Sequence, residues 1–424
     1  MGPHPSGERD WHRRAALIAA AIALLAVLGV VFVRNLTDFS VYYTAGQSLL
    51  SGRTDLYAPD FARGVVMDYR YLPFFLVAFI PLWHTPYPLA AWVWHLLDTL
   101  AIVVAVASIA SIYTKVPYSR VKVWTVAFLA VVPYFAMAMD YGNAHLIATA
   151  LMFAGLSLAL RRRELPAAAL LAVAITIKIV PVLTLPYFAV TRRFRLLGLV
   201  AIFTAALNLL PAAYFGLAGN RDLIERWYAH VIAGQEFHET NGPINLSLKG
   251  QLRRNFTEVD YRQRVDGDHR YAAVNVAAFS PLTTDRVWLA LSAGTFAGGL
   301  VLIWLSARMR DATNGENDVR LEALQLGLMI CLMLFVGPLT SKVYLIALLW
   351  PVVAVGGAAW DRGAIRRTLI VVAILSSALP LLPGRALQRL LLVAGTDFYV
   401  SCAIFGLVAF TLMRAAPVAR HVTR

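Results

Sequence analysis

The chain has 424 residues, of which 59% are hydrophobic and 15% charged, and its formal net charge is +14. Soluble domains are about half apolar and about a quarter charged, so a water-soluble fold is excluded because it would leave too much apolar surface in water. The apolar residues form continuous runs rather than the alternation of barrel strands, which predicts an all-α polytopic membrane protein. Most basic residues flank these runs, so lipid headgroups explain the positive charge and no nucleic-acid partner is expected.

Two of the predicted apolar segments are irregular. Segment 71–82 is too short to cross a bilayer and is bracketed by Pro73 and Pro81, so we expect it to be re-entrant or to lie on the surface. Segment 166–190 carries Lys178 and Pro181 near its middle, which predicts two half-helices that dip into the membrane and return. The other segments predict about ten full spans. In chain order, the segments are 15–34, 71–82, 88–111, 121–139, 143–160, 166–190, 196–217, 285–307, 321–337, 341–359, 366–383 and 397–413.

The basic clusters predict the orientation of the chain. If segments 71–82 and 166–190 do not cross, every basic cluster falls on one side of the membrane, which the positive-inside rule makes the cytoplasm. These clusters are Arg13/Arg14, Lys115/Arg120/Lys122, Arg161–Arg163, Arg192/Arg193/Arg195, Arg308/Arg310, Arg362/Arg366/Arg367 and Arg420/Arg424. We therefore expect a multi-pass protein of the cell (inner or plasma) membrane. Segment 15–34 lacks a small-residue cleavage site and is expected to be a retained first helix, not a removed signal peptide.

Two polar regions are expected on the extracytoplasmic side. The first is 35–70, and the second, 217–284, is the longest polar stretch and is expected to hold helices near 221–234 and 246–255. The predicted organisation is an N-terminal membrane module (1–217) with the first outer loop and the catalytic motif, an extracytoplasmic loop (218–284) and a C-terminal membrane module (285–424).

Asp38 is the first candidate for chemistry. Thr37 or Asp38 is expected to cap a helix that runs to about Leu50 and ends at Gly52, with Phe39 and Tyr42 on a face that rests on the membrane interface. A carboxylate at this place can act as a general base on a hydroxyl. The alternative is that Asp38 is a plain helix cap.

Lys178 is the second candidate, because a charge at membrane depth needs a partner or a water-filled cavity. A lipid-linked phosphate would be a suitable partner, and a lysine that extends to a headgroup is the alternative. The other candidates lie near outer span ends or in the long loop, where sugar hydroxyls or phosphate could bind, with interfacial turns, solvated basic faces and membrane anchors as the alternatives. They are Asp140, Asn143 and His145, then Asn245, Ser247, Lys249, Arg253 and Arg254, and finally Lys342 and Tyr344.

Nucleotide and metal motifs are absent from the sequence. It has no Gly-x-x-x-x-Gly-Lys-Ser/Thr, no Gly-x-Gly-x-x-Gly after a strand, no HExxH and no Asp-x-Asp pair. The two cysteines, Cys331 and Cys402, lie inside apolar runs and indicate neither a disulfide framework nor a metal cluster. We therefore expect no metal site and no cofactor, and an activated substrate would have to arrive attached to lipid.

At these residues the chain resembles glycosyltransferase family 87, the polyprenyl-phosphate-sugar-dependent transferases with a membrane-embedded GT-C fold. Its members include actinobacterial α-mannosyltransferases and related arabinofuranosyltransferases. The resemblance covers most of the chain in order. Its five motifs are Asp38-Phe-Ser-Val-Tyr-Tyr with Asp55-Leu-Tyr57, Tyr71-Leu-Pro73-Phe, Asp140-Tyr-Gly-Asn143, Lys178-Ile-Val-Pro181 and Asn245-Leu-Ser247-Leu.

The resemblance implies roles for these residues. Asp38 would deprotonate the acceptor hydroxyl, which attacks the anomeric carbon in line and displaces the lipid phosphate with inversion. The donor phosphate would be bound by Lys178, Lys249, Arg253 and Arg254 without a metal. Substrate-binding residues would be Tyr42, Tyr71, Asp140, Asn143, His145, Asn245, Ser247, Lys342 and Tyr344. The partners are a polyprenyl-phosphate-linked sugar, a lipid or glycan acceptor and the bilayer.

The sequence departs from the family pattern at several positions. Thr340 to Tyr344 lacks the histidines that mannosyl members often carry near the later motif, Asn143 and His145 stand where Gln and Asn are usual, and Leu246 replaces a Gln. These departures leave a mannose-like and an arabinofuranose-like sugar both open. A transporter or flippase of lipid-linked glycan is the alternative function, although no internal repeat of the transporter kind is visible. A structural or assembly role is a third possibility.

Overall fold

The computed structural model describes residues 36–58, 68–113, 120–233, 245–257, 276–308 and 315–415. The predicted first span, 15–34, lies outside these ranges, as do Arg13/Arg14, Lys115, Arg310 and Arg420/Arg424. In the described ranges every regular element is helical, and the only β pairing is an isolated bridge between Thr257 and Phe279. The expected all-α membrane fold is therefore confirmed.

Six described helices are long and apolar enough to cross a bilayer. A seventh crossing results if α10 (Phe194–Leu209) and α11 (Ala212–Trp227) with its π-helical end η2 (Tyr228–Ile232) count as one span bent by 102°. Helices α7 (His145–Leu160) and α17 (Gly363–Ala378) have 16 residues each, or roughly 24 Å, less than the roughly 30 Å apolar layer. The count of ten stays a prediction. The six are α5 (Tyr87–Ile112), α6 (Arg120–Tyr141), α14 (Pro281–Arg308), α15 (Gly315–Val336), η4 with α16 (Lys342–Leu348, Leu349–Ala359) and α19 (Thr396–Ala415).

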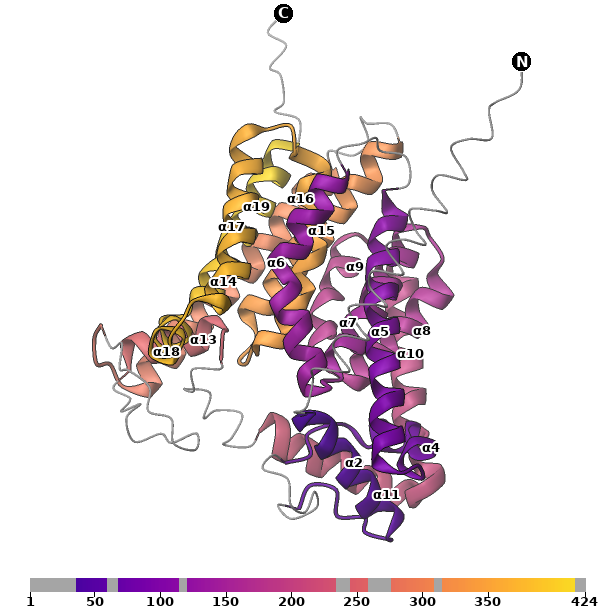
Figure 1. Cartoon of the computed structure of the whole chain (residues 1–424). Coiled ribbons are helices and arrows are strands. Elements are labelled where there is room, and N and C mark those ends of the chain that lie inside the picture. Colours follow the sequence, from indigo (N-terminus) through magenta and orange to yellow (C-terminus); the bar gives the residue numbers. More distant parts are fainter. Residues whose placement is uncertain are drawn as a thin grey trace, which may run out of the picture.

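Three described basic residues near helix ends, Arg161, Arg162 and Arg193, lie at one end of the bundle. Arg161 donates to the carbonyl of Ser111 at 2.6 Å, and Arg162 pairs with Glu322 at 2.9 Å. These contacts join the ends of α5 and α7 to the start of α15. At the opposite end lie α2 (Thr37–Leu50), α11, α13 (Leu248–Phe256) and α18 (Arg385–Ala394), as Figure 1 shows.

Segment 166–190 enters the bundle and returns to the end where it began. Helix α8 (Glu164–Ile177) stops at Lys178, whose backbone is extended (φ −139°, ψ 124°), and the chain continues as η1 (Val180–Thr184) and α9 (Pro186–Val190). Glu164 at the start of α8 pairs with Arg193 before α10 at 3.6 Å, so the two ends of the segment are side by side. The predicted break at Lys178 is confirmed.

Segment 71–82 forms two short helices, α3 (Pro73–Ala78) and α4 (Ile80–Trp83), neither of which could cross a bilayer. Trp83 lies against α2 at Gly46, where an added Cβ atom would overlap the indole ring. The indole N–H donates to the carbonyl of Leu76 at 2.9 Å. Glycine at position 46 therefore lets α2 and α4 approach closely.

Two expectations for α2 were wrong. The helix begins at Thr37 after Leu36, which takes a left-handed conformation (φ 34°), so neither Thr37 nor Asp38 is the cap. Phe39 and Tyr42 do not rest on the membrane interface, because both rings are fully buried against Trp94 of α5, at 5.4 and 5.5 Å between ring centroids. Packing against the aromatic residues of α3 and α5 decides the orientation of this helix. Gly52 (φ +89°) follows its end, as expected.

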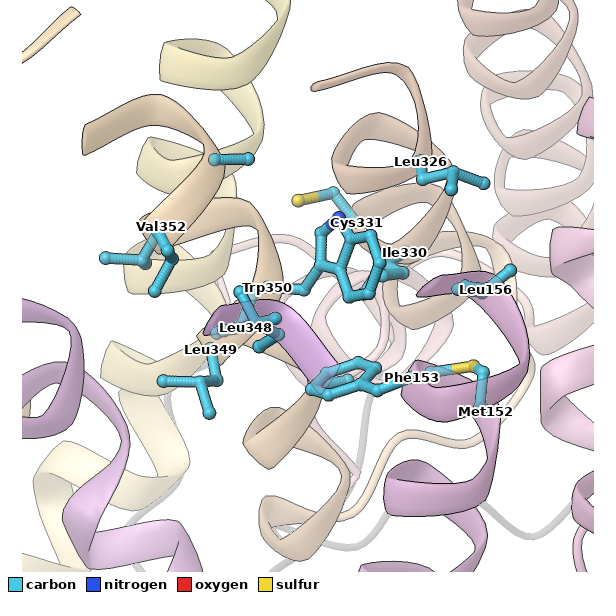
Figure 2. Close-up of a cluster of buried hydrophobic side chains, with 14 of the residues drawn as sticks. Met152, Phe153, Leu156, Leu326, Ile330, Cys331, Leu348, Leu349, Trp350 and Val352 are labelled. Atoms are coloured by element: carbon cyan, nitrogen blue, oxygen red, sulfur yellow. The ribbon is translucent and has the colours of Figure 1, made fainter. Parts of the chain in front are cut away.

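The larger hydrophobic core fixes η4 in the bundle. Figure 2 shows Trp350 among side chains of α7, α15 and the η4–α16 span. Its ring lies 5.4 Å from that of Phe153, and its indole N–H donates to the carbonyl of Ala323 at 2.9 Å. This packing fixes the η4–α16 span, whose Tyr344 also packs against the same core.

Candidate active site at the end of α2

A tight turn brings Asp38 to the junction of α6 and α7. The backbone N–H of Leu36 donates to the carbonyl of Asp140 at 2.8 Å, which docks the start of α2 on the end of α6. Gly142 follows with φ +62°, and a Cβ atom there would lie 2.7 Å from Cβ of Phe39. Glycine at this position is therefore required for both the turn and the approach of α2. Asp140 contributes its carbonyl group to this junction.

The amide of Asn143 is oriented by two hydrogen bonds. Its Oδ1 accepts from the backbone N–H of His145 at 2.8 Å, so its Nδ2 is left to donate to Oδ2 of Asp38 at 2.5 Å. Asn143 is buried, whereas Asp38 is half-buried. Burial raises the pKa of the Asp38 carboxyl, while the Asn143 hydrogen bond and the charge of Lys178 act to lower it.

Lys178 lies between two tyrosine rings on the same side of the molecule. Its Nζ is 4.7 Å from the ring centroid of Tyr71 and 5.4 Å from that of Tyr344, and it interacts electrostatically with Asp38. The hydroxyl of Tyr71 is 2.5 Å from that of Tyr42, whose oxygen accepts from the backbone N–H of Ala144 at 3.4 Å. The break after α8 thus places the Lys178 ammonium group near enough to the Asp38 carboxylate of α2 to interact with it electrostatically.

His145 packs against the same group of residues. Its ring stacks on Tyr344 with centroids 4.1 Å apart and an angle of 18°. His145 is buried, and neither ring nitrogen has a hydrogen-bond partner in the described part of the chain. Asp38, Tyr42, Tyr71, Asn143, His145, Lys178 and Tyr344 are therefore brought together in one cluster.

The three basic residues of α13 make their contacts elsewhere. Arg253 binds Asp285 of α14 through two bonds of 2.8 and 2.5 Å, and Lys249 lies 3.7 Å from the same carboxylate and 4.6 Å from the ring of Trp288. Burial lowers the pKa of Lys249, against the effect of Asp285. Arg254 is fully buried and donates to the carbonyl of Asn245 and, at 2.6 Å, to the side chain of Gln251.

Asn245 and Ser247 hold the start of α13 to the segment before η4. Asn245 Nδ2 donates to the carbonyl of Pro338 at 3.0 Å, and its Oδ1 accepts from the N–H groups of Thr340 and Ser247. Ser247 caps α13 by accepting from the N–H of Gly250 at 3.2 Å. Segment 338–344 therefore connects the start of α13 with the Asp38 cluster. Its first residues bind Asn245, and its last residue, Tyr344, belongs to the cluster.

Asp397 and Tyr134 are site neighbours that sequence reasoning missed. Lys342 pairs with Asp397 at 3.2 Å, and the Tyr134 hydroxyl donates to the same carboxylate at 2.9 Å. This network ties η4 to α6 and α19. An ionisable residue at the edge of an apolar span is a functional signal that would have identified Asp397. The partner of Lys249 and Arg253, Asp285, carries the same signal at the start of α14.

Together, the fold and this cluster define a multi-pass helical membrane protein with a carboxylate, an amide and an ammonium group at one end of the bundle. The sequence profile of glycosyltransferase family 87 matches residues 69–338, more than half of the chain. The chain belongs to this family and is a membrane glycosyltransferase. The matched region includes Tyr71, Asn143 and Lys178, and Asp38 precedes it.

Comparison with curated proteins and with solved structures gave no match. In the described residues, no group of three or more His, Cys, Asp or Glu side chains is placed to hold a metal ion.

Proposed function

We propose that this glycosyltransferase moves a mannose-like or arabinofuranose-like sugar from a polyprenyl-phosphate donor to a hydroxyl of a lipid- or glycan-linked acceptor. The observation that carries the proposal is that Asp38 and Lys178 lie in one cluster, near enough to interact electrostatically, with Asn143 bound to the first and Tyr71 beside the second. Asp38 and Lys178 are 140 positions apart in the chain and come from α2 and the break after α8. A carboxylate beside an ammonium group suits a reaction in which a proton leaves one reactant and a phosphate leaves the other.

Asp38 is the proposed base. Its carboxylate accepts the proton of the acceptor hydroxyl as the acceptor oxygen forms its bond to the anomeric carbon. The bond between that carbon and the phosphate oxygen breaks, and the polyprenyl phosphate leaves with the electron pair. Displacement in a single step inverts the anomeric configuration. Asn143 keeps one carboxylate oxygen occupied, which leaves the other for the acceptor.

Lys178 is the proposed partner of the leaving phosphate. It is half-buried, and the contacts that hold its ammonium group are mainly with tyrosines, so an entering phosphate need not displace a carboxylate that is bonded directly to it. Lys249 and Arg253 could bind phosphate only by exchanging Asp285 for it. Among the four basic residues expected at the phosphate, Lys178 is therefore the one that we assign to the leaving group.

The proposed site faces the extracytoplasmic side. The basic clusters Arg161–Arg163 and Arg192/Arg193/Arg195 lie at the end of the bundle opposite α2, and the positive-inside rule assigns them to the cytoplasm. Nucleotide sugars are absent outside the cell, which agrees with the lack of a nucleotide motif and supports a lipid-linked donor in the cell membrane.

The proposal is tested with the full-length protein in proteoliposomes that contain a polyprenyl-phosphate mannose or a polyprenyl-phosphate arabinofuranose with a radiolabelled sugar. We expect label in an acceptor glycolipid, with an inverted anomeric centre by NMR. Lys178→Met should reduce transfer by about 10²-fold or more, and Lys122→Met, which removes an exposed lysine near the start of α6, should leave it unchanged. Movement of the labelled donor between leaflets without any transfer would instead support the transporter alternative.

A further inference from the structure

A row of aromatic rings connects the proposed active site with the surface of the molecule. From the site outward, the ring centroids of Tyr42 and Tyr71 are 4.9 Å apart, and those of Tyr71 and Tyr69 are 5.8 Å apart. Tyr69 lies 6.1 Å from Tyr57, which lies 6.2 Å from His230 of η2. The inner three rings are buried, whereas Tyr57 and His230 are half-buried. We call Tyr57 and His230 the outer aromatic pair.

Charged side chains lie within a few residues of the outer aromatic pair in both segments, Arg53 and Asp55 before Tyr57 and Arg226 before His230. Arg53 binds Asp55 through two bonds of 3.0 and 2.6 Å, and both side chains keep part of their surface in solvent. Arg226 of α11 is near enough to act on the charge of Asp55. Exposed ring surface beside a carboxylate and guanidinium groups is suited to a sugar, whose C–H face packs on a ring while its hydroxyls bind polar groups.

The charges of this region favour a neutral ligand. The described charged side chains of segments 53–70 and 221–226 are four basic and four acidic, although the whole chain carries +14. Three ion pairs account for six of the eight, namely Arg53 with Asp55, Arg221 with Glu225 and Arg226 with Asp222. A surface for a phosphate or an anionic headgroup would instead carry an excess of positive charge. The eight are Arg53, Asp55, Asp68, Arg70, Arg221, Asp222, Glu225 and Arg226.

We infer that the outer aromatic pair is a subsite for a sugar ring of the acceptor, which is therefore a neutral glycan chain and not a bare lipid. The aromatic row runs from this subsite to Tyr42, which lies near enough to Asp38 to interact with it electrostatically. This inference rests on the proposed function, because it assigns the acceptor of the same reaction.

Binding of neutral saccharides tests the subsite without any transfer. The full-length protein in nanodiscs is titrated with a linear α-mannotriose, with an arabinofuranotriose and with mannose 6-phosphate, and dissociation constants are measured by saturation-transfer NMR. We expect a neutral trisaccharide to bind more tightly than the phosphorylated sugar. Tyr57→Ala and His230→Ala should each weaken binding by about tenfold, whereas Tyr228→Ala, which removes an exposed tyrosine from the same segment, should have no effect.

Tyr57→Phe separates the subsite from a purely structural role of Tyr57. The Tyr57 hydroxyl donates to the carbonyl of Tyr71 at 2.8 Å, so a structural role predicts that Phe and Ala are equally harmful. A stacking role predicts that Phe binds the trisaccharide within about threefold of wild type. Equal losses in both variants, no binding of either trisaccharide up to about 10 mM, or a preference for the phosphorylated sugar would each overturn the inference.

Kinetics distinguish a failure of the subsite from a failure of the proposed function. In the transfer assay, Tyr57→Ala should raise the acceptor KM by about tenfold and leave the donor KM unchanged. Transfer that depends on Asp38 but not on Tyr57 would overturn the subsite alone. Saccharide binding that depends on Tyr57, in a protein that transfers no sugar, would overturn the proposed function alone.

Discussion

Asn143 donates a hydrogen bond of 2.5 Å to the carboxylate of Asp38 and can do so in only one orientation. The backbone N–H of His145 binds the amide oxygen of Asn143, so the amide N–H must face the carboxylate. From the sequence, Asn143 is expected to contact the sugar. Because its amide is fixed against the carboxylate, we propose instead that Asn143 positions Asp38, the base.

Removal of this hydrogen bond should affect both the rate and its pH dependence. Asn143→Ala should lower kcat by about tenfold to 10²-fold, because the carboxylate is no longer oriented. The amide stabilises the charged form of Asp38, so its loss should raise the pKa of Asp38 further and move the acid limb of the pH profile to higher pH. A merely structural loss would lower the rate without moving this limb.

The wild-type enzyme should lose activity at a pH above the ordinary carboxyl range. Burial is the largest influence on Asp38 and raises its pKa above the usual value of about 3.9. A base must be deprotonated to act, so kcat/KM should reach a plateau on the alkaline side of this raised pKa and fall as the pH drops through it. An acid limb at or below the ordinary value, measured over a range in which the protein stays folded, would contradict this environment for Asp38.

Replacement by leucine should change the stability of the protein in opposite directions at two buried carboxylates, Asp98 and Asp397. Asp98 of α5 is fully buried, and neither of its oxygens has a hydrogen-bond partner in the described residues. Asp98→Leu should therefore stabilise the protein by about 1–3 kcal/mol. Asp397→Leu should destabilise it, because Lys342 and Tyr134 would lose their shared partner. The midpoint of thermal unfolding in detergent measures both, and a lower midpoint for Asp98→Leu would show that this carboxyl has a partner.

Gly142 is expected to be essential to the site. A Cβ atom at this position would meet Cβ of Phe39 at 2.7 Å, and the positive φ adds backbone strain. Gly142→Ala should therefore displace α2 and reduce transfer by about tenfold or more. Gly363→Ala, at a glycine with open space around its Cβ position, is the matched control and should retain full activity. Equal activity of the two variants would show that α2 is not docked at this turn.

Local patterns in the sequence were sufficient for the elements with clear physical signals. The break at Lys178 followed from a charge and a proline in an apolar run, and Pro73 and Pro81 indicated the short helices α3 and α4. The burial of Phe39 and Tyr42 could not be derived in this way. Their environment is made by Tyr71, Phe75 and Trp94, which belong to other segments of the chain.

The partners of the candidate cations also depend on tertiary structure. Lys249, Arg253 and Arg254 formed a basic cluster in the sequence that suited phosphate. The structure pairs the first two with Asp285, which lies 32 positions after Arg253 in the chain, and buries the third beside Asn245. Sequence spacing could not predict this, because α13 and α14 are brought together only by the fold. Lys178 and Asp38, by contrast, lie near enough to interact electrostatically, and their shared role in the reaction stays a prediction.

Substitution of the proposed base tests the central claim most directly. Asp38→Asn keeps the size of the side chain and removes its ability to accept a proton, and Asp361→Asn changes an exposed carboxylate elsewhere on the chain. With equal amounts of folded protein in proteoliposomes, the initial rate of sugar transfer from the polyprenyl-phosphate donor should fall by about 10²- to 10⁴-fold for Asp38→Asn and stay unchanged for Asp361→Asn. Transfer by Asp38→Asn within about threefold of the wild-type rate would contradict the assignment of Asp38 as the base.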